Sequence, residues 1–256
     1  MYIPELVYPG TWVEDPDRDW AWQVQLPLEQ LASIVADAAL SLSLYEQAAR
    51  RLLAPPDRKE EPDRGQEPLP DVIKKLEAKQ VPPAKLPELL LEAQRTRKRK
   101  ERHAGRLPQS YQHRLPFIHA RSYLFTMDRL ERLVGVLASM PRAPQQAKHG
   151  HESLRGLMPH LRGVRNSSAH LEDRSRGLDR MGRPLDLKPI DNHLIRAPGG
   201  VLALENLCNN RFGSTMDDGS YGEVDVSEAS LRQVTEVVQE IIDAFPWTGM
   251  RRVEPT

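Results

Sequence analysis

The residues best suited to chemistry lie between positions 165 and 170, where the chain reads Arg-Asn-Ser-Ser-Ala-His. Arg165 carries a permanent cation whose planar guanidinium matches phosphate oxygens, and His170 can accept or donate a proton near neutral pH. Asn166, directly after the arginine, adds an amide that both donates and accepts hydrogen bonds. This combination predicts a site that cuts or grips a phosphodiester.

The interval of five between arginine and histidine is almost uninformative by itself. With 27 arginines and 8 histidines in the chain, about 0.8 chance matches are expected at that offset. The interval occurs twice more, each time with a helix-breaking proline inside it: at Arg114 with His119, and at Arg155 with His160. Requiring asparagine after the arginine lowers the chance expectation to about 0.02. The specificity therefore comes from Asn166 and the helical context.

Arg165-Asn166-x-x-x-His170, with the small Ala169 before the histidine, resembles the signature of HEPN domains (higher eukaryotes and prokaryotes nucleotide-binding). The order of elements is also similar, since a long helix precedes the motif, short strands follow it and an amphipathic helix closes the chain. The resemblance covers residues 115–246, with 28–53 as the first bundle helix and 54–114 as an insertion. It implies a mainly α protein, a single helical domain over 1–256 that forms an antiparallel bundle with a short β-hairpin insertion before the last helix.

The resemblance implies an endoribonuclease that needs neither a metal nor another cofactor, a hydrolase of the kind found in toxin and defence systems. In that reaction the ribose 2′-OH attacks the adjacent phosphorus and leaves a 2′,3′-cyclic phosphate. His170 would transfer protons, Arg165 would balance charge on the phosphoryl oxygens, and Asn166 would position the histidine or bind the phosphate. Asp173, three residues after His170, could orient the imidazole ring.

A single copy of the motif faces two difficulties. One histidine cannot easily act as base and acid at once, and five helical steps of about 100° place Arg165 about 140° from His170 in a straight helix. Either the arginine curls around the helix, the helix bends, or a neighbouring subunit completes the site. The resemblance implies a homodimer in which two motifs face a common groove. Burial of Arg165 and His170 in separate salt bridges would count against an enzyme.

Two other functions use the same residues. A noncatalytic HEPN module would hold a nucleotide, RNA or partner protein in its dimer cleft without turnover. A helical scaffold would use the motif only as a cluster of salt bridges at a helix end, where the helix dipole favours cations. We expect no metal site, because His149, His151 and His160 have no carboxylate at a recognisable ligand spacing. An antitoxin protein is the expected partner if the chain is a toxin.

Composition sets broad limits on the fold and the partners. The 256 residues are 39% hydrophobic, enough for a core, and the 36 basic and 36 acidic residues give no net charge. Any attraction to RNA must therefore be local. The single cysteine, Cys208, excludes an intrachain disulfide, and no apolar run approaches a membrane span. With no leader pattern at the start of the chain, we expect a cytoplasmic protein without a membrane partner.

The first half of the chain alternates ordered and polar segments. Residues 1–25 are rich in Trp, Tyr, Pro and Asp and predict an extended N-terminal arm, and apolar residues spaced by three and four from Leu28 to Leu52 predict a long helix. Residues 55–70 combine charge with proline and predict a linker, followed by helices around 71–79 and 85–104. The second of these helices ends in a basic cluster that could bind RNA phosphates: Arg97, Lys98, Arg99 and Lys100.

The second half of the chain contains the motif and its supports. Residues 115–140 predict a helix with a broad apolar stripe suited to the bundle centre, and a polar loop over 141–150 should lead into a motif helix over 151–173. Short strands are expected in a β insertion at about 190–226, with a hairpin turning at Asp218-Gly219. Ser227 should cap a final helix that ends before Pro246.

Overall fold

A computed structural model describes residues 2–53, 82–105 and 107–255, and the chain divides into two compact units. The first unit combines residues 1–46 with 117–256, and the second comprises 47–116. The described chain is mainly helical, as the periodic apolar pattern predicts. Within it, no helix is both long and apolar enough to cross a membrane.

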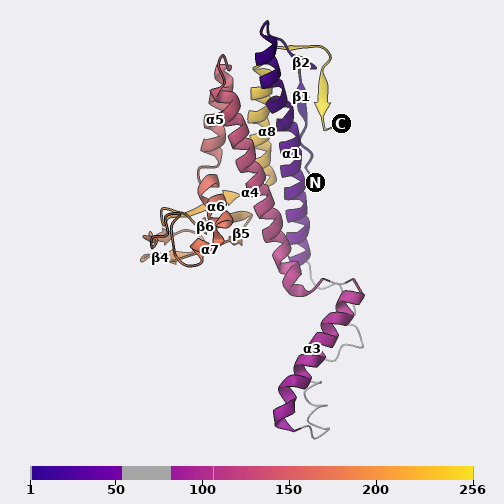
Figure 1. The fold of residues 1–256 in the computed structure, drawn as a ribbon, viewed down its shortest axis with the longest axis vertical. Coiled ribbons are helices and arrows are strands. Elements are labelled where there is room, and N and C mark those ends of the chain that lie inside the picture. Colours follow the sequence, from indigo (N-terminus) through magenta and orange to yellow (C-terminus); the bar gives the residue numbers. More distant parts are fainter. Residues whose placement is uncertain (1, 54–81, 106, 256) are drawn as a thin grey trace. The chain divides into compact units, whose positions relative to one another are not determined.

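Long helices packed side by side form the body of the first unit (Figure 1). They are α5 (Gln145–Leu157), α8 (Glu228–Asp243) and most of α1 (Arg18–Leu53) and α4 (Gln109–Ser139), since the end of α1 and the start of α4 belong to the second unit. Helices α1 and α4 run antiparallel, because Ser41 hydrogen-bonds Ser122 at 2.9 Å while Asp37, earlier on α1, lies 4.0 Å from Arg129, later on α4. Most of the apolar residues predicted to face the bundle from α1 are buried, whereas Ala49 and Leu52 near its end are only half-buried. The buried ones are Leu28, Leu31, Val35, Ala38, Leu42 and Tyr45.

The predicted apolar stripe of α4 is only partly buried. Leu124, Leu130, Val134 and Leu137 lie in the core. Ile118, Phe125 and Val136 are instead 45%, 42% and 50% exposed, so the expectation that the whole stripe fills the bundle centre is wrong. These three residues follow each other at helical spacing on the outward side of the helix, and two of them, Ile118 and Phe125, line a groove described below.

The N-terminal arm is shorter than predicted. Helix α1 begins at Arg18, so Trp20 and Trp22 lie in the helix rather than in an arm over 1–25. The helix starts here because the Asp17 carboxylate accepts a hydrogen bond from the backbone N–H of Trp20 at 3.1 Å, which satisfies one of the free donors of the first turn. Strands β1 (Leu6–Tyr8) and β2 (Trp12–Val13) then pair antiparallel with the C-terminal strands β9 (Arg252–Glu254) and β8 (Trp247–Thr248).

The motif segment is divided rather than continuous. The expected loop over 141–150 and the single helix over 151–173 are both wrong, since α5 begins at Gln145 and is followed by α6 (Leu161–Ala169) and α7 (Leu171–Arg174). Pro159 removes a backbone donor after α5, and His170 leaves helical geometry between the other two. The motif therefore occupies a short helix with a break at its histidine.

Small antiparallel sheets follow α7. Strands β5 (Asn206–Cys208), β6 (Arg211–Thr215) and β7 (Tyr221–Asp225) form a three-stranded sheet, and β3 (Ile190–Asp191) pairs with β4 (Arg196–Ala197). The hairpin predicted at Asp218-Gly219 is present between β6 and β7, and Gly219 takes the left-handed φ of +79° that the turn requires. Ser227 caps α8 as predicted, since its hydroxyl accepts a hydrogen bond from the backbone N–H of Ser230 at 3.2 Å.

The second unit contains the 3₁₀ turn η1 (Pro83–Lys85) and helix α3 (Leu86–His103), close to the predicted helix over 85–104. Of the basic cluster, Lys98, Arg99 and Lys100 are exposed on α3, and Arg97 belongs to the same helix. The predicted linker over 55–70 and helix over 71–79 lie outside the described residues.

Candidate functional site

Helix α6 is fixed on the β6–β7 hairpin. Leu161 and Val164 are buried, and the Ser167 hydroxyl donates to the backbone carbonyl of Thr215 at 2.8 Å. A Cβ on Gly163 would lie 2.3 Å from Sδ of Met216, so the absence of a side chain there allows the helix to approach the hairpin closely. The motif residues therefore project from a rigidly packed element.

Arg165 points from α6 to α4, where it pairs with the buried carboxylate of Asp128. Its Nε donates to Oδ2 of Asp128 at 3.0 Å, and Nη2 contacts the same oxygen. Arg132, one turn later on α4, also reaches this oxygen through Nε at 3.0 Å. The Arg165 side chain is 17% exposed and that of Asp128 5% exposed. The cation of the motif is thus mostly buried and locally neutralised.

Asn166 and Phe125 complete the surroundings of the Arg165 guanidinium. Nη1 of Arg165 donates to Oδ1 of Asn166 at 2.9 Å, and Cζ of Arg165 lies 5.5 Å from the centre of the Phe125 ring, a cation–π distance. The amide oxygen of Asn166 therefore orients the arginine within one chain. The guanidinium has five donors in a fixed plane, and these contacts hold that plane in one orientation.

His170 lies at the break between α6 and α7. Its φ of −118° and ψ of 47° are non-helical, so the 140° separation calculated for a straight helix does not apply to it. The chain thus leaves helical geometry at His170, which is one of the alternatives considered for the angular problem. The His170 side chain is 58% exposed, and its Nδ1 lies 3.5 Å from Oε1 of Glu172. The imidazole is accessible to a substrate or to a second molecule.

Two acidic residues follow His170, of which Glu172 is exposed and Asp173 is half-buried. Glu172, rather than the expected Asp173, makes the nearest carboxylate contact to the ring, and Oδ1 of Asp173 lies 3.8 Å from Arg176. His170, Glu172 and Asp173 bring one ligand atom each within 4.8 Å of the others, which is the one grouping in the described ranges that could hold a metal ion.

Arg174 anchors the segment that follows the histidine. Its side chain is 1% exposed, its Nη2 lies 2.5 Å from Oδ1 of Asp217 in the β6–β7 turn, and Nη1 donates to the carbonyl of Leu178. The same Asp217 oxygen accepts from the backbone N–H of Arg180 at 2.7 Å. The hairpin therefore holds both sides of His170, through Ser167 before it and Arg174 after it.

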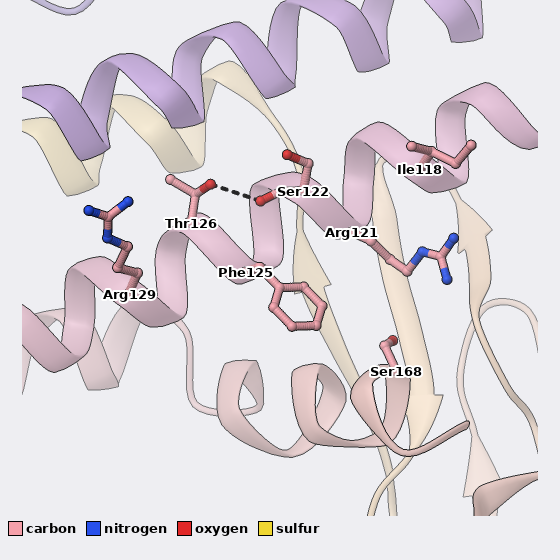
Figure 2. Close-up of a pocket in the computed structure, with 7 residues that line it drawn as sticks. All are labelled: Ile118, Arg121, Ser122, Phe125, Thr126, Arg129 and Ser168. Carbon is pink, nitrogen blue, oxygen red and sulfur yellow. Dashed lines mark hydrogen bonds between the residues drawn. The ribbon is translucent and has the colours of Figure 1, made fainter. Parts of the chain in front are cut away.

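A groove of about 460 Å³ lies beside the motif over the outward face of α4 (Figure 2). We call it the α4 groove, and it is lined by Ile118, Arg121, Ser122, Phe125, Thr126, Arg129 and Ser168. Ser168 belongs to α6, two residues before His170. The hydroxyl oxygen of Ser168 is buried and has no hydrogen-bond partner among the described residues.

The predicted site residues are therefore only partly brought together. Arg165 and Asn166 contact each other, His170 ends the same helix with Asp173 close behind it, and the cluster Arg97 to Lys100 belongs to the second unit. Burial of both Arg165 and His170 in separate salt bridges would weigh against an enzyme, and only Arg165 meets that condition, because its pair with Asp128 is mostly buried. His170 is also paired, with Glu172, but this pair is exposed.

Asp128 is the residue that sequence reasoning missed. Its signal was present, because it directly follows the buried Met127 and lies four positions after the buried Leu124, so a carboxylate occupies the inward side of an apolar helix. A buried carboxylate requires a cation or several donors. Nothing in the local spacing, however, shows that the cation is Arg165, 37 positions later.

Compared with known proteins, the chain matches no protein-family model, no curated protein and no solved structure. The functional assignment consequently depends on the motif residues and their surroundings.

Proposed function

We propose that this protein is a HEPN-type endoribonuclease that cleaves RNA without a metal and leaves 2′,3′-cyclic phosphate ends. The supporting observation is that one short helix presents a guanidinium held in a single orientation and, at the helix end, an exposed imidazole. This pairing of a fixed cation with an accessible proton carrier suits attack on a phosphodiester.

The chemistry requires one proton to be removed and another to be delivered. An imidazole of His170 takes the proton of the 2′-OH as the 2′ oxygen bonds to phosphorus. The bond from phosphorus to the 5′ oxygen breaks, and that oxygen receives a proton from an imidazolium. Arg165 balances the charge on the phosphoryl oxygens through the donors not used by Asp128 and Asn166. Each histidine contribution is typically about 10²- to 10⁴-fold in rate.

A twofold dimer supplies the second histidine in this proposal. The exposure of His170 on one chain leaves it free to face His170 of the partner subunit across a cleft. The helices α1, α4, α5 and α8 then form the HEPN-like bundle that presents the two motifs. The proposed setting is a cytoplasmic toxin or defence ribonuclease, with an antitoxin protein as regulator.

A noncatalytic binding module is the second candidate, and one observation favours it. The Asp128 carboxylate already neutralises Arg165, which is 17% exposed, so less of its charge is available to a developing oxyanion. In this alternative the same dimer holds RNA, a nucleotide or a protein without turnover.

Cleavage assays separate the two candidates. Purified protein is incubated with single-stranded and structured RNA in the presence of a chelator, and the products are analysed for cyclic phosphate ends. The enzyme requires cleavage by the wild type and a loss of at least about 100-fold in His170→Ala. His149→Ala, at another exposed histidine of the same unit, is the matched control and should cleave normally. Because His170 is exposed, the His170→Ala variant should have the same midpoint of urea unfolding as the wild type.

The outcomes are distinct. RNA binding without cleavage by the wild type favours the binding module. Cleavage that survives in His170→Ala would exclude the proposed mechanism. Light scattering of the wild type tests the dimer independently of activity.

A further inference from the structure

We propose that the α4 groove is a nucleotide-binding subsite that holds one unpaired base of single-stranded RNA against Phe125, with the adjoining phosphates on Arg121 and Arg129. Its position beside the scissile bond rests on the proposed ribonuclease function, whereas binding in the groove does not require cleavage. The chemistry of the lining residues supports this occupant in three ways.

The first support is the exposed aromatic ring. Phe125 is 42% exposed, although a phenyl ring is usually buried in a helical body. Figure 2 shows the ring projecting from α4 toward α6, where Ser168 points back from the facing helix. The Arg165 guanidinium lies 5.5 Å from the ring centre and helps to hold it in place. An exposed aromatic ring of this kind can stack on any base, because every base has a π surface.

The second support is the charge of the lining, which contains two arginines and no carboxylate. Arg129 is 62% exposed, and its only ion pair among the described residues is with Asp37 at the long distance of 4.0 Å. Arg121 uses Nη1 for Glu205 at 3.0 Å, which leaves most of its five donors for a ligand. Eight residues of helix separate the two arginines, a rise of about 12 Å along α4. The two arginines thus lie before and after Phe125 along α4, with the Arg129 side chain turned toward Asp37 of α1 in this structure.

The third support is an unsatisfied hydroxyl. The Ser168 oxygen is buried and lacks a hydrogen-bond partner among the described residues, although it lines the groove. Buried hydroxyls normally have a partner, so this oxygen is suited to a polar group of a ligand. Ser168 also connects the groove to the motif, because it lies between Arg165 and His170 on α6. A base held at Phe125 would place the RNA strand next to Arg165 and His170.

Fluorescence anisotropy with a labelled single-stranded 2′-O-methyl RNA tests the subsite. This probe lacks the 2′-OH nucleophile, so binding is measured without cleavage. Phe125→Ala should weaken binding about 5- to 100-fold, and Phe125→Trp should restore it, as expected for loss and recovery of one stacked base. Val136→Ala removes an equally exposed apolar side chain from the same helix outside the groove and should bind as the wild type does. Urea unfolding confirms that each variant is folded.

The phosphate contacts have a separate signature. Arg129→Gln should weaken binding and reduce the slope of log K against log salt by about 0.7, the effect of one lost phosphate contact on a single strand. A blunt duplex of the same sequence should bind more weakly than the single strand and should be insensitive to Phe125→Ala, because its bases are not accessible.

Several results would overturn the subsite. If Phe125→Ala binds the probe as tightly as the wild type does, the groove does not hold a base, even where His170→Ala abolishes cleavage. If Phe125→Ala changes the oligomeric state and leaves RNA binding unchanged, the groove is a protein interface. If the wild type binds the probe through Phe125 but cleaves no RNA, the subsite stands and the ribonuclease proposal fails.

Discussion

Asp128 and Arg165 form a largely buried ion pair that joins α4 to α6 across 37 positions of sequence. Oδ2 of Asp128 receives Nε and Nη2 of the arginine, while the other carboxylate oxygen, Oδ1, is buried without a hydrogen-bond partner within the described residues. Arg165 is consequently both a motif residue and a support of the fold. Substituting it changes two properties at once, whereas substituting the exposed His170 changes the proposed chemistry alone.

We predict that the two arginines that contact Asp128 contribute very differently to the free energy of unfolding. Arg165→Ala leaves a buried carboxylate without its main cation and should lower the free energy of unfolding by about 3 kcal/mol. Arg132 contacts the same oxygen at 3.0 Å but is 52% exposed, so Arg132→Ala should cost less than about 1 kcal/mol. Urea unfolding followed by circular dichroism measures both values. Equal losses in the two variants would show that burial does not determine the strength of this pair.

A double-mutant cycle isolates the pair itself. In an Asp128→Ala background, Arg165→Ala should cost much less than it does in the wild type, because the carboxylate that needs the cation is gone. If the stability losses of the two single substitutions simply add in the double variant, Arg165 is held by Phe125 and Asn166 rather than by Asp128.

A second buried arginine supports the segment after His170. Arg174 is 1% exposed and Asp217 is 37% exposed, so removing the aspartate leaves an uncompensated buried charge, whereas removing the arginine leaves a carboxylate that water can reach. We expect Asp217→Ala to destabilise the protein by about 3 kcal/mol and Arg174→Met to cost less than that. Thermal or urea unfolding shows which variant is less stable. A larger loss in Arg174→Met would show that the apolar stem of Arg174 matters more than its charge.

The long helices were predictable because their stabilisation is periodic along the chain. The buried series from Leu28 to Tyr45 on α1, and the Ser227 cap of α8, are local patterns of three to four residues. The start of α1 was not predicted because residues 1–25 are rich in Trp, Tyr, Pro and Asp, a composition that suggested an extended arm. Asp17 caps the helix within this segment. A bend near the motif was only one of three alternatives, and its position at His170 could not be predicted because no proline or glycine marks it.

The residues of the candidate site come from the sequence, whereas their contacts could not be predicted from it. Arg165, Asn166 and His170 are adjacent in sequence, so their types alone indicate a phosphodiester. Asp128 and Phe125, which contact Arg165, come from α4. A contact between helices that are distant in sequence produces no recognisable spacing of residues along the chain. The outward side of α4 was assigned to the core because periodicity counts apolar residues and does not distinguish the buried Leu124 from the exposed Phe125.

The Asp218 carboxylate in the turn between β6 and β7 should make the stability of the protein fall slightly at acidic pH. Hydrogen bonds from the Ser220 hydroxyl and backbone N–H, together with Lys188, lower the pKa of Asp218 below its ordinary value. Because the folded pKa is depressed, the stabilisation is complete above the unfolded pKa of about 3.9 and is lost as pH falls through the lower folded value. The side chain is 60% exposed, so the effect should stay below about 1 kcal/mol. The urea midpoints of wild type and Asp218→Asn should differ at pH 7 and converge on acidification; a constant difference would exclude the carboxylate as the cause.

Two glycines with left-handed backbones should respond differently to alanine. Gly177 has a φ of +71° and open space where a Cβ would lie, so Gly177→Ala adds only backbone strain, about 1–2 kcal/mol. Gly219 has a φ of +79°, and its Cβ would lie 1.8 Å from the backbone oxygen of Asp186. Because neither that carbonyl nor the turn can move without disturbing the hydrogen bond from Lys188 N–H to the Gly219 carbonyl at 3.0 Å, Gly219→Ala should cost about 3 kcal/mol or more. Unfolding of the two variants in urea measures the difference. Equal, small losses would mean that the segment containing Asp186 does not pack on the β6–β7 turn in solution, and the hairpin would then be a weaker support for α6 than its contacts indicate.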